Sequence, residues 1–558
     1  MSQSTVPADR PETGTAGSDR PADPATSAST AAQRIAHGYD TDQACVTLGS
    51  VVIDGTADPT ALVRIPLSML NRHGLVAGAT GTGKTKTLQG IAEQLSAAGV
   101  PVLMPDIKGD LSGLHAPGEG GDAITTRASD TGDDWSPQAF PVEFYSLAGQ
   151  GAGVPIRATV DSFGPILLSK VLGLNETQES TLGLIFHWCD QQNLPLLDLK
   201  DLREVVTYLT GDDGKAELHK LGGVSTATAG VILRAVTNLS AQGGDGFFGE
   251  PEFTIGDLLR TDSAGRGIIG LLEVGDLQSR PALFSTFLMW LLAELFENLP
   301  EVGDVDKPKL VFLFDEAHLL FDDASKAFRN AIEQTVKLIR SKGVGVFFCS
   351  QLPTDIPDDV LSQLGARIQH ALRAFTPKDQ QALATTVKTY PVTDDYDLAK
   401  ALTSLGIGEA IVTVLSEKGA PTPVAWTRMC APRSLMDPIP AADLATAVAA
   451  SPLAGKYGTA VDRESAYEML TTRLAQQADA AAAAQAKEQA EQQAKEQAQQ
   501  DEEREASRSS RRDSGGDGGG VLGEIMGNTA VKSFMRSMAS AIGGALGRSI
   551  FGTRKRRR

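Results

Sequence analysis

Apolar and polar positions follow two kinds of pattern along the middle of the chain. From about Ala44 to about Pro440, short apolar runs typical of buried strands are separated by segments whose apolar residues recur with helical spacing. This order of elements predicts an α/β domain built on a mainly parallel sheet. A strand-like segment begins near Ala44, and the further predicted strands are residues 74–77, 100–104, 142–145, 267–272, 310–314, 344–349, 368–374 and 410–415.

Two regions depart from this alternation. Between about Val160 and Leu259 the pattern is mostly helical, without a clear buried strand, and it predicts an α-helical insertion within the α/β domain. Residues 474–507 consist almost entirely of Ala, Gln, Glu, Lys and Arg, which favours a helix but supplies few large apolar side chains. Because a coiled-coil seam needs larger residues at its a and d positions, we expect a solvated single helix.

The two ends of the chain differ from its middle. Residues 1–40 are rich in Ser, Thr, Ala, Pro and Asp without apolar periodicity, which predicts disorder. Residues 513–520 read DSGGDGGG, which is typical of a flexible linker. Beyond them apolar residues recur at helical spacing, and the chain ends in five basic residues. Such an amphipathic helix suits a membrane surface, DNA phosphates, a neighbouring subunit, or packing on its own chain.

Composition and charge narrow the functional classes. Hydrophobic residues make up 41% and charged residues 22%, the balance of a folded protein, so a wholly disordered chain is excluded. The net charge of −18 repels nucleic acid on average, so any contact with DNA must come from a local basic surface. The cysteines lie far apart, without disulfide or metal spacing. The apolar stretch 281–296 is too short to span a bilayer, so we predict a core helix, no integral membrane segment and a cytoplasmic location.

One motif predicts a phosphate-binding loop. Residues 78–85 read GATGTGKT and match the Walker A pattern G-x-x-x-x-G-K-[ST], between a predicted strand and a predicted helix. The glycines let backbone N–H groups turn toward phosphates, and the helix N-terminus adds a positive dipole. We expect Lys84 to reach the β- and γ-phosphates of ATP and Thr85 to ligate Mg²⁺. The predicted nucleotide-binding residues are Gly78, Ala79, Thr80, Gly81, Thr82, Gly83, Lys84, Thr85 and Lys86.

A second motif ends a strongly apolar predicted strand. Residues 310–316 read LVFLFDE, so two carboxylates follow the buried run. Asp315 suits the Walker B role of holding Mg²⁺, and Glu316 suits the general base that polarises the attacking water. His318 completes the string DEAH, and its place in the following helix favours packing or support of its neighbours over catalysis.

Two further predicted strands end in polar residues. Gln351 follows the strand 344–349, where its amide can bond the γ-phosphate or the attacking water, or can satisfy the turn before Pro353. The strand 100–104 runs into PDIKGD, which places Asp106 and Lys108 at the carboxyl edge of the sheet, where ligands bind. Either residue can support the site or belong to a solvated loop.

Phosphoryl transfer in ring-shaped NTPases usually uses a cation from the neighbouring subunit to neutralise developing charge. Arg367 and Arg373 follow the Gln351 strand and are the main candidates for this role. Arg280 and Arg234 are weaker candidates, and the pattern alone does not choose among the four.

The string DEAH invites comparison with superfamily 2 helicases. The Ser-Ala-Thr motif and the arginine-rich motif of a second motor domain do not follow Glu316, so that comparison fails. The chain instead resembles the HerA/FtsK superfamily of ring-forming ATPases, most closely the bacterial HerA-helicase-like (YjgR-like) family. The resemblance rests on HGLVAGATGTGKTKT (73–87), PDIKGDLSG (105–113), KPKLVFLFDEAHLLF (307–321), FFCSQLPTDIP (347–357) and LGARIQHALRAFTPKDQ (364–380).

The resemblance implies a RecA-like fold, hydrolysis of ATP with Mg²⁺, a homo-hexamer, and double-stranded DNA as the substrate on which a helicase-like motor translocates or remodels. It also implies that Arg367 is the arginine finger. A different class, an NTP-driven switch or remodeller of a protein partner, fits the acidic charge and the lack of a visible DNA-binding module. The residues predicted to be catalytic are Lys84, Glu316, Gln351 and Arg367, and those predicted to hold the metal are Thr85 and Asp315.

Together these observations predict an α/β protein with a RecA-like P-loop NTPase core on a mainly parallel sheet, an α-helical insertion, and a helical or disordered C-terminal tail. The predicted segments are 1–40, disordered; 41–160, the first part of the ATPase domain with Walker A; 161–260, the helical insertion; 261–440, the second part with Walker B and the Gln351 strand; 441–512, helical and rich in Ala, Gln and Glu; 513–520, a Gly-rich linker; and 521–558, an amphipathic helix with a basic tail.

Overall fold

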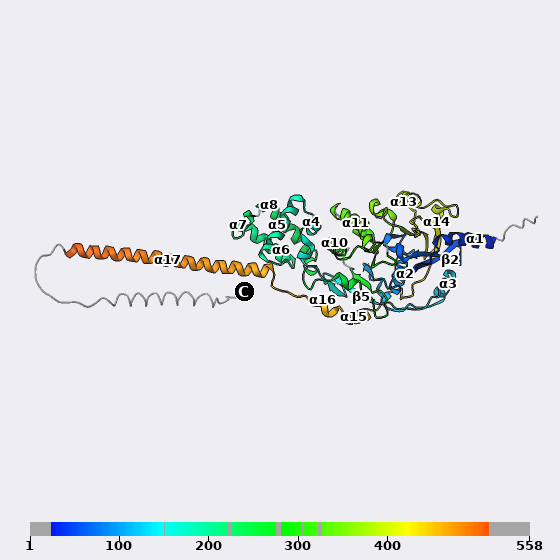
Figure 1. Ribbon diagram of the computed structural model, residues 1–558, viewed down its shortest axis with the longest axis horizontal. Coiled ribbons are helices and arrows are strands. Elements are labelled where there is room, and N and C mark those ends of the chain that lie inside the picture. The colour runs from blue at the N-terminus through cyan, green and yellow to red at the C-terminus, as the bar shows by residue number, and fades with distance from the viewer. Residues whose placement is uncertain are drawn as a thin grey trace, which may run out of the picture. The chain divides into compact units, whose positions relative to one another are not determined.

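The computed structural model describes residues 24–149, 151–220, 222–223, 225–274, 281–303, 305–321 and 326–512. The chain divides into two compact units, Met1–Leu474 and Ala475–Arg558. The predicted linker 513–520 and the predicted helix 521–558 lie outside the described residues, as does Arg280. The first unit holds the sheet and everything that positions the candidate site (Figure 1).

The first unit is built on one 12-stranded sheet with the order β2-β1-β12-β11-β10-β3-β9-β8-β4-β7-β5-β6. From β10 to β6 every neighbouring pair is parallel, whereas β2, β1, β12 and β11 join antiparallel at one end. The strands are β1 (Cys45–Ile53), β2 (Thr56–Pro66), β3 (Gly74–Ala77), β4 (Val102–Asp106), β5 (Val142–Leu147), β6 (Val154–Ile156), β7 (Ile269–Glu273), β8 (Leu310–Phe314), β9 (Val344–Ser350), β10 (Ala366–His370), β11 (Glu409–Thr413) and β12 (Ala425–Met429).

The mainly parallel α/β fold predicted from the sequence is confirmed. Each predicted strand overlaps an observed strand, with ends that differ by a few residues. Three observed strands were not predicted: β2, β6 and β12. The β2 strand contains Asp58 and Pro59 and is exposed in its first half, so its apolar pattern is weak. The β6 strand has three residues, too few for a periodic pattern.

Both faces of the sheet are buried, as parallel sheets require. Successive residues of β8 point to opposite faces, so Phe312 packs in one hydrophobic cluster while Val311 and Leu313 pack in the other. Helix α2 (Lys84–Ala97) covers the face of Val311, and α10 (Pro281–Asn298) and α11 (Lys326–Ile339) cover the face of Phe312. The other helices of the α/β part are α1 (Pro24–Ala36), α3 (Asp122–Thr131), α12 (Asp358–Leu361), α13 (Pro377–Val387), α14 (Leu398–Ser404), α15 (Ala441–Ala449) and α16 (Ala454–Tyr457).

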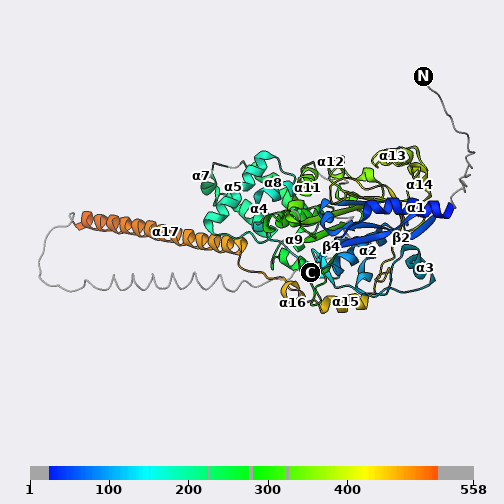
Figure 2. The same cartoon turned by 45° about the vertical axis from the view of Figure 1, so that its right-hand side comes forward.

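The predicted helical insertion is present as a group of helices between β6 and β7. Figures 1 and 2 show α4 to α8 gathered beside α10 and α11, and α4 contacts both of these helices. The insertion comprises α4 (Val160–Val171), α5 (Glu176–Gln192), α6 (Leu199–Thr210), α7 (Lys215–Lys220), α8 (Thr226–Ala241) and α9 (Gly244–Phe247). The insertion therefore extends the same hydrophobic core instead of forming a separate one.

The prediction that residues 1–40 are disordered is wrong for the part that the structure describes. Helix α1 packs on β1 and β2, and Ala32, Ile35 and Tyr39 are buried there. Alanines supply much of this buried face, so the apolar periodicity is too faint to stand out in a Ser- and Ala-rich sequence.

Helix α17 (Ala466–Arg512) agrees with the helix expected from the composition of residues 474–507. Its first turns belong to the first unit, where Ala466 and Leu470 are buried and Arg473 pairs with Glu217 at 2.8 Å. In the second unit, the side chains of residues 475–507 are exposed throughout, as expected for a solvated helix. Among the described residues, no helix combines the length and apolar character that crossing a bilayer requires, and α10 is a core helix.

Candidate functional site

The predicted phosphate-binding loop joins β3 to α2 at the carboxyl edge of the sheet. It is anchored to two neighbouring strand ends, because the Gly78 amide donates to the Ser350 carbonyl at 3.2 Å and the Ala79 amide donates to the Ala371 carbonyl at 2.8 Å. A Cβ on Gly78 would lie 2.5 Å from the Cβ of His370, so only glycine fits there. The backbone of the loop is thus held in shape by the sheet itself.

The N-terminus of α2 is free to bind an anion. Gly83 precedes the helix with φ of 111°, a left-handed conformation that favours glycine, and it provides no side-chain cap. The first amides of a helix lack intrahelical partners and attract negative charge. Lys84 is buried, and its amine donates to the Ala79 carbonyl at 3.3 Å across the loop. Loop, helix end and lysine therefore form a cradle suited to phosphates.

The structure brings the two motifs into direct contact. The Thr85 hydroxyl donates to Oδ2 of Asp315 at 3.1 Å, although the two residues are 230 positions apart in the chain. Oδ1 of the same carboxylate accepts the Glu316 amide at 2.8 Å. A hydroxyl and a carboxylate are hard oxygen ligands, and Mg²⁺ is commonly held by one or two such groups together with water and substrate phosphates. This pair fits a magnesium ion.

Glu316 has an unusual environment. Its φ of 49° places it in the left-handed region, which a residue with a side chain seldom adopts. Its carboxylate is buried, and Oε1 accepts from the amine of Lys108. Oε2 lies 3.4 Å from Nδ1 of His318, and both of these buried atoms lack a hydrogen-bond partner among the described residues. Strained backbone and unpaired buried atoms are often found at functional sites.

The Lys108 loop is shaped by Asp106 at the end of β4. The Asp106 carboxylate accepts the amides of Gly109 at 2.7 Å, Asp110 at 3.2 Å and Leu111 at 2.9 Å. Burial nevertheless raises the pKa of Asp106. On the next strand, burial and then the charge of Asp106 raise the pKa of Glu273 to about 7. Carboxylates therefore line this edge over three neighbouring strands, β8, β4 and β7.

The other predicted residues that the structure describes do not contact Thr85, Asp315 or Glu316 through any hydrogen bond or ion pair given above. Gln351 is exposed at the end of β9, the strand between β3 and β8. Arg373 donates to the Thr80 carbonyl of the phosphate-binding loop at 3.2 Å. Arg367 pairs in register with Leu75, away from the carboxyl edge. Arg234 is exposed on α8 in the insertion.

Lys86 points away from the phosphate cradle. Its amine donates to the carbonyl of Met436 and to Oε1 of Gln89, the latter at 3.2 Å. Burial lowers the pKa of Lys86. The structure therefore connects Lys86 to the segment after β12, and its backbone amide at the start of α2 is the part nearest the cradle.

An apolar cavity of about 220 Å³, here called the P-loop cavity, opens beside Gly83. Arg127 braces one wall, because it donates to the carbonyls of Gly408 at 2.9 Å and Ile407 at 3.0 Å. The Gly408 amide in turn donates to the Thr82 carbonyl at 2.9 Å. The cavity is lined by Gly83, Lys86, Thr87, Ala123, Ile124, Arg127, Ile407, Gly408, Met429, Cys430, Ala431, Pro432 and Met436.

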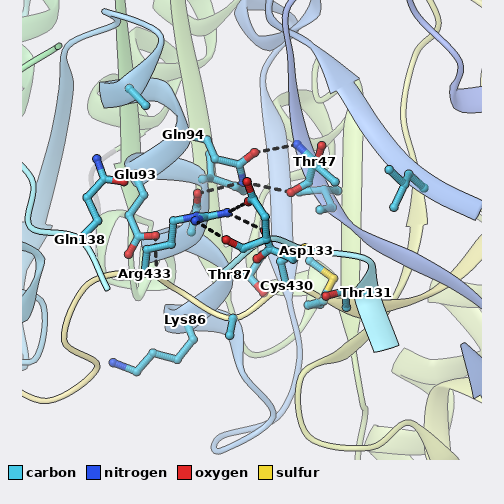
Figure 3. A pocket seen from close by; sticks show the side chains of 18 of the residues that line it. Thr47, Lys86, Thr87, Glu93, Gln94, Thr131, Asp133, Gln138, Cys430 and Arg433 are labelled. Carbon is cyan, nitrogen blue, oxygen red and sulfur yellow. Dashed lines mark hydrogen bonds and ion pairs between the residues drawn. The ribbon is translucent and has the colours of Figure 1, made fainter. Parts of the chain in front are cut away.

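A larger cavity of about 360 Å³, here called the α2 cavity, lies along α2 between β1 and the segment after β12 (Figure 3). Its polar side chains have partners in the protein: Gln94 exchanges two hydrogen bonds with the Thr47 backbone at 2.8 and 2.9 Å, and Arg433 pairs with Asp133 at 2.6 Å. Glu93 accepts the Arg433 amide at 2.8 Å. None of the lining side chains has a buried polar atom without a hydrogen-bond partner among the described residues.

Sequence reasoning left two features of the site unassigned. The pairing of Lys108 with Glu316 joins residues on different strands, and the motif PDIKGD gave only their approximate location at the sheet edge. The bracing of the P-loop cavity by Arg127 had no motif at all. Gly406-Ile407-Gly408, a Gly-rich turn before a strand, was the one signal that a backbone approaches closely there.

A family model and two curated relatives match most of the chain. The family model described as Helicase HerA-like C-terminal matches residues 53–558. The chain is 22% identical over 368 residues to the DNA double-strand break repair helicase HerA of Sulfolobus acidocaldarius, a match that covers 65% of this chain and 66% of that protein. It is 23% identical over 356 residues to the protein of the same name from Sulfurisphaera tokodaii, covering 63% and 64%. The chain thus spans just under two thirds of the length of these relatives.

Among solved structures, the bacterial conjugative coupling protein TrwBdeltaN70 aligns with 73% of this chain and 94% of its own length, at a TM-score of 0.47 and 14% sequence identity. Plasmid coupling protein TrwB has also been solved in complex with ADP and Mg²⁺.

Proposed function

The chain belongs to the HerA-like helicase family, and from that premise we propose that it is a Mg²⁺-dependent ATPase that works as a motor on double-stranded DNA. Hydrolysis at the Walker A and B edge drives translocation on DNA or its remodelling, and the working form is a homo-hexamer. The observation that carries the ATPase proposal is the 3.1 Å contact between Thr85 Oγ1 and Asp315 Oδ2. It unites a phosphate cradle and a metal-binding carboxylate at one sheet edge.

Each part of this edge has a chemical role. The amides at the start of α2 and the amine of Lys84 bind the phosphates and favour the negative charge that develops on them. Thr85 and Asp315 hold Mg²⁺, which neutralises charge on the transferring phosphoryl group when it is bound.

Glu316 is the general base of this proposal. It follows Asp315 directly in the chain, and its backbone amide donates to Oδ1 of Asp315 at 2.8 Å. A carboxylate within hydrogen-bond reach of a water can orient that water and accept its proton as the water attacks the γ-phosphorus. Oε2 of Glu316 has no hydrogen-bond partner among the described residues and is therefore available as this acceptor once water can reach it.

The P-loop cavity is the place for the nucleoside. It begins at Gly83 and Thr87, on the side of the loop from which α2 runs on, and its walls are largely apolar. Small-molecule sites typically combine such walls with a few polar groups. The aromatic face of a base suits the side chains of Ile407 and Met429, and Arg127 keeps the wall in place.

Gln351 and Arg367 complete the proposal as groups that act on the γ-phosphate, the first within a subunit and the second from a neighbouring subunit. Mixing two inactive variants tests the second role. Lys84→Ala keeps Arg367, and Arg367→Ala keeps the cradle, so a mixed ring regains activity at interfaces that join the two intact halves. Arg373 contacts its own loop, so Arg373→Ala mixed with Lys84→Ala gives no such recovery. Equal recovery in both mixtures would remove Arg367 from this role.

The decisive experiment for DNA measures phosphate release by the full chain with and without double-stranded DNA, with Lys84→Ala as the inactive control. We expect turnover that requires Mg²⁺ and rises with DNA, and a hexamer mass in the presence of nucleotide. Turnover that ignores DNA but rises with a protein partner would overturn the DNA proposal in favour of a protein remodeller, which the net charge of −18 favours. No turnover at all would overturn the ATPase proposal.

A further inference from the structure

One ion pair at the candidate site involves Glu316, the proposed general base. Lys108 and Glu316 come from loops after two adjacent strands, β4 and β8, and Lys108 Nζ donates to Glu316 Oε1. The glutamate side chain is 10% exposed, whereas the lysine side chain is 44% exposed. The lysine can therefore swing into solvent or toward a ligand, while the glutamate is held in place.

The surrounding structure holds Lys108 at this position. Asp106 accepts three successive loop amides, those of Gly109, Asp110 and Leu111, so the turn that carries Lys108 is fixed at its base. Burial lowers the pKa of Lys108, but the hydrogen bond to Glu316 and the charge of Asp315 outweigh it and raise that pKa overall. The ammonium charge is thus favoured by both carboxylates of the Walker B pair.

In this arrangement Glu316 is not ready to serve as a base. Oε1 is occupied by Lys108, and Oε2 is shielded from solvent. A base must present an oxygen to the attacking water. The carboxylate must therefore be released before hydrolysis.

We propose that Lys108 is a positioning residue that restrains Glu316 when no triphosphate is bound. When a triphosphate binds, Lys108 moves from Glu316 to the γ-phosphate, and the carboxylate is freed. This inference rests on the proposed ATPase function. The exchange is electrostatic and breaks no covalent bond: the ammonium leaves one anion and joins another, more highly charged one. ADP lacks the γ-phosphate and leaves the pair intact, so the base becomes available only when there is a phosphoryl group to transfer.

Nucleotide affinities measured in a double-mutant cycle test the proposal. The dissociation constants of AMP-PNP and of ADP, each with Mg²⁺, are determined for the wild type, Glu316→Gln, Lys108→Gln and the double variant. Glu316→Gln replaces the ion pair by a neutral contact and frees Lys108, so we expect AMP-PNP to bind about fivefold tighter or more relative to ADP, the lower end of ordinary coupling between sites. In the Lys108→Gln background the same substitution changes this ratio less than about twofold.

Two further variants sharpen the result. Lys108→Arg keeps the cation, and in that background Glu316→Gln again tightens AMP-PNP binding relative to ADP. Lys337 and Glu333 form a similar pair on α11, so Lys337→Gln serves as the matched control and leaves the ratio unchanged. An effect of Glu316→Gln that is equal with and without Lys108 reflects simple charge repulsion and overturns the inference. Failure of the wild type to bind AMP-PNP overturns the proposed ATPase function instead.

Discussion

Two polar regions border α2, one at its N-terminus and one along its length, and their hydrogen bonding differs. At the Walker A and B edge, Oε2 of Glu316 and Nδ1 of His318 are buried 3.4 Å apart, and neither has a hydrogen-bond partner among the described residues. The N-terminus of α2 has no side-chain cap. In the α2 cavity, Gln94 bonds the Thr47 backbone, Glu93 accepts the Arg433 amide, and the Arg433 side chain pairs with Asp133 (Figure 3).

The difference supports the proposal that the Walker A and B edge, and not the α2 cavity, binds a ligand. An unpaired buried polar group costs free energy, so it persists where a ligand, metal or water completes it. A fully paired network instead joins segments that are distant in the chain, here α2 with β1 and with the segment after β12.

The largest effect is expected from a substitution of Asp315, the carboxylate proposed to hold Mg²⁺. Asp315→Asn keeps the shape but removes the charge that faces Thr85. We expect kcat for ATP to fall about 10²–10³-fold, as for loss of one key electrostatic group in an active site. Asp133→Asn in the α2 cavity is the matched control, and its kcat stays near that of the wild type. Phosphate release across a Mg²⁺ titration measures both, and equal losses in the two variants would contradict the distinction.

The next largest effect is a loss of stability when a hydrogen-bonded side chain of the α2 cavity is removed. Glu93 is buried and accepts the amides of Arg433 and Ser434 at 2.8 and 3.0 Å, so Glu93→Ala leaves these donors unpaired. We expect a loss of about 2–4 kcal/mol in the free energy of unfolding. Denaturant unfolding measures it, with the exposed Glu491→Ala as control. The kcat of the folded variant stays close to normal, and a large loss of kcat without a loss of stability would assign the cavity to catalysis.

A smaller effect concerns the strand between the two motifs. Gln351 is exposed at the end of β9, so its removal disturbs no packing. If its amide acts on the γ-phosphate, Gln351→Ala lowers kcat about tenfold and leaves the melting temperature unchanged. Steady-state kinetics beside thermal melting separates this role from the alternative, in which the amide merely satisfies the turn at Pro353 and kcat does not move.

The smallest effect tests the electrostatics of the edge. The pKa of Glu273 is raised to about 7 by burial and by Asp106, above the ordinary value of 4.5. The folded protein therefore retains a proton that the unfolded chain releases, and this stabilisation is complete below about pH 4.5 and is lost as pH rises through about 7. The side chain in Glu273→Gln is uncharged at every pH. The melting temperature of this variant, relative to that of the wild type, therefore increases between about pH 5 and about pH 8. A gap that does not change with pH would contradict this.

The sequence predicted the architecture well because strong local patterns encode it. The apolar run 310–314 forms β8, and the Walker A loop follows β3; only β9 lies between these parallel strands, so their carboxyl ends lie at the same edge of the sheet. Strands at the antiparallel end were harder, since β2 begins with exposed polar residues and Pro59. Helix α1 was missed because small alanines form much of its buried face.

The sequence motifs predicted which residues belong to the candidate site, but not every contact between their side chains. The contact between Thr85 and Asp315 follows from two recognisable strand ends. The pairing of Lys108 with Glu316 depends on how a loop turns after β4, which is set by three amides that bind Asp106 and not by any residue pattern. Arg367 lies on β10 in register with Leu75, and its proposed role would be played in a neighbouring subunit, so its own position in this chain does not test that role.

The most direct test of the central claim, that one sheet edge binds and hydrolyses ATP, is a paired measurement on Glu316→Gln. ATP binding and single-turnover hydrolysis are followed in the same sample with Mg²⁺. We predict that the variant binds ATP at least as tightly as the wild type and hydrolyses it about 10²–10⁴-fold more slowly, the range expected for loss of a general base. Hydrolysis at the wild-type rate would contradict the account.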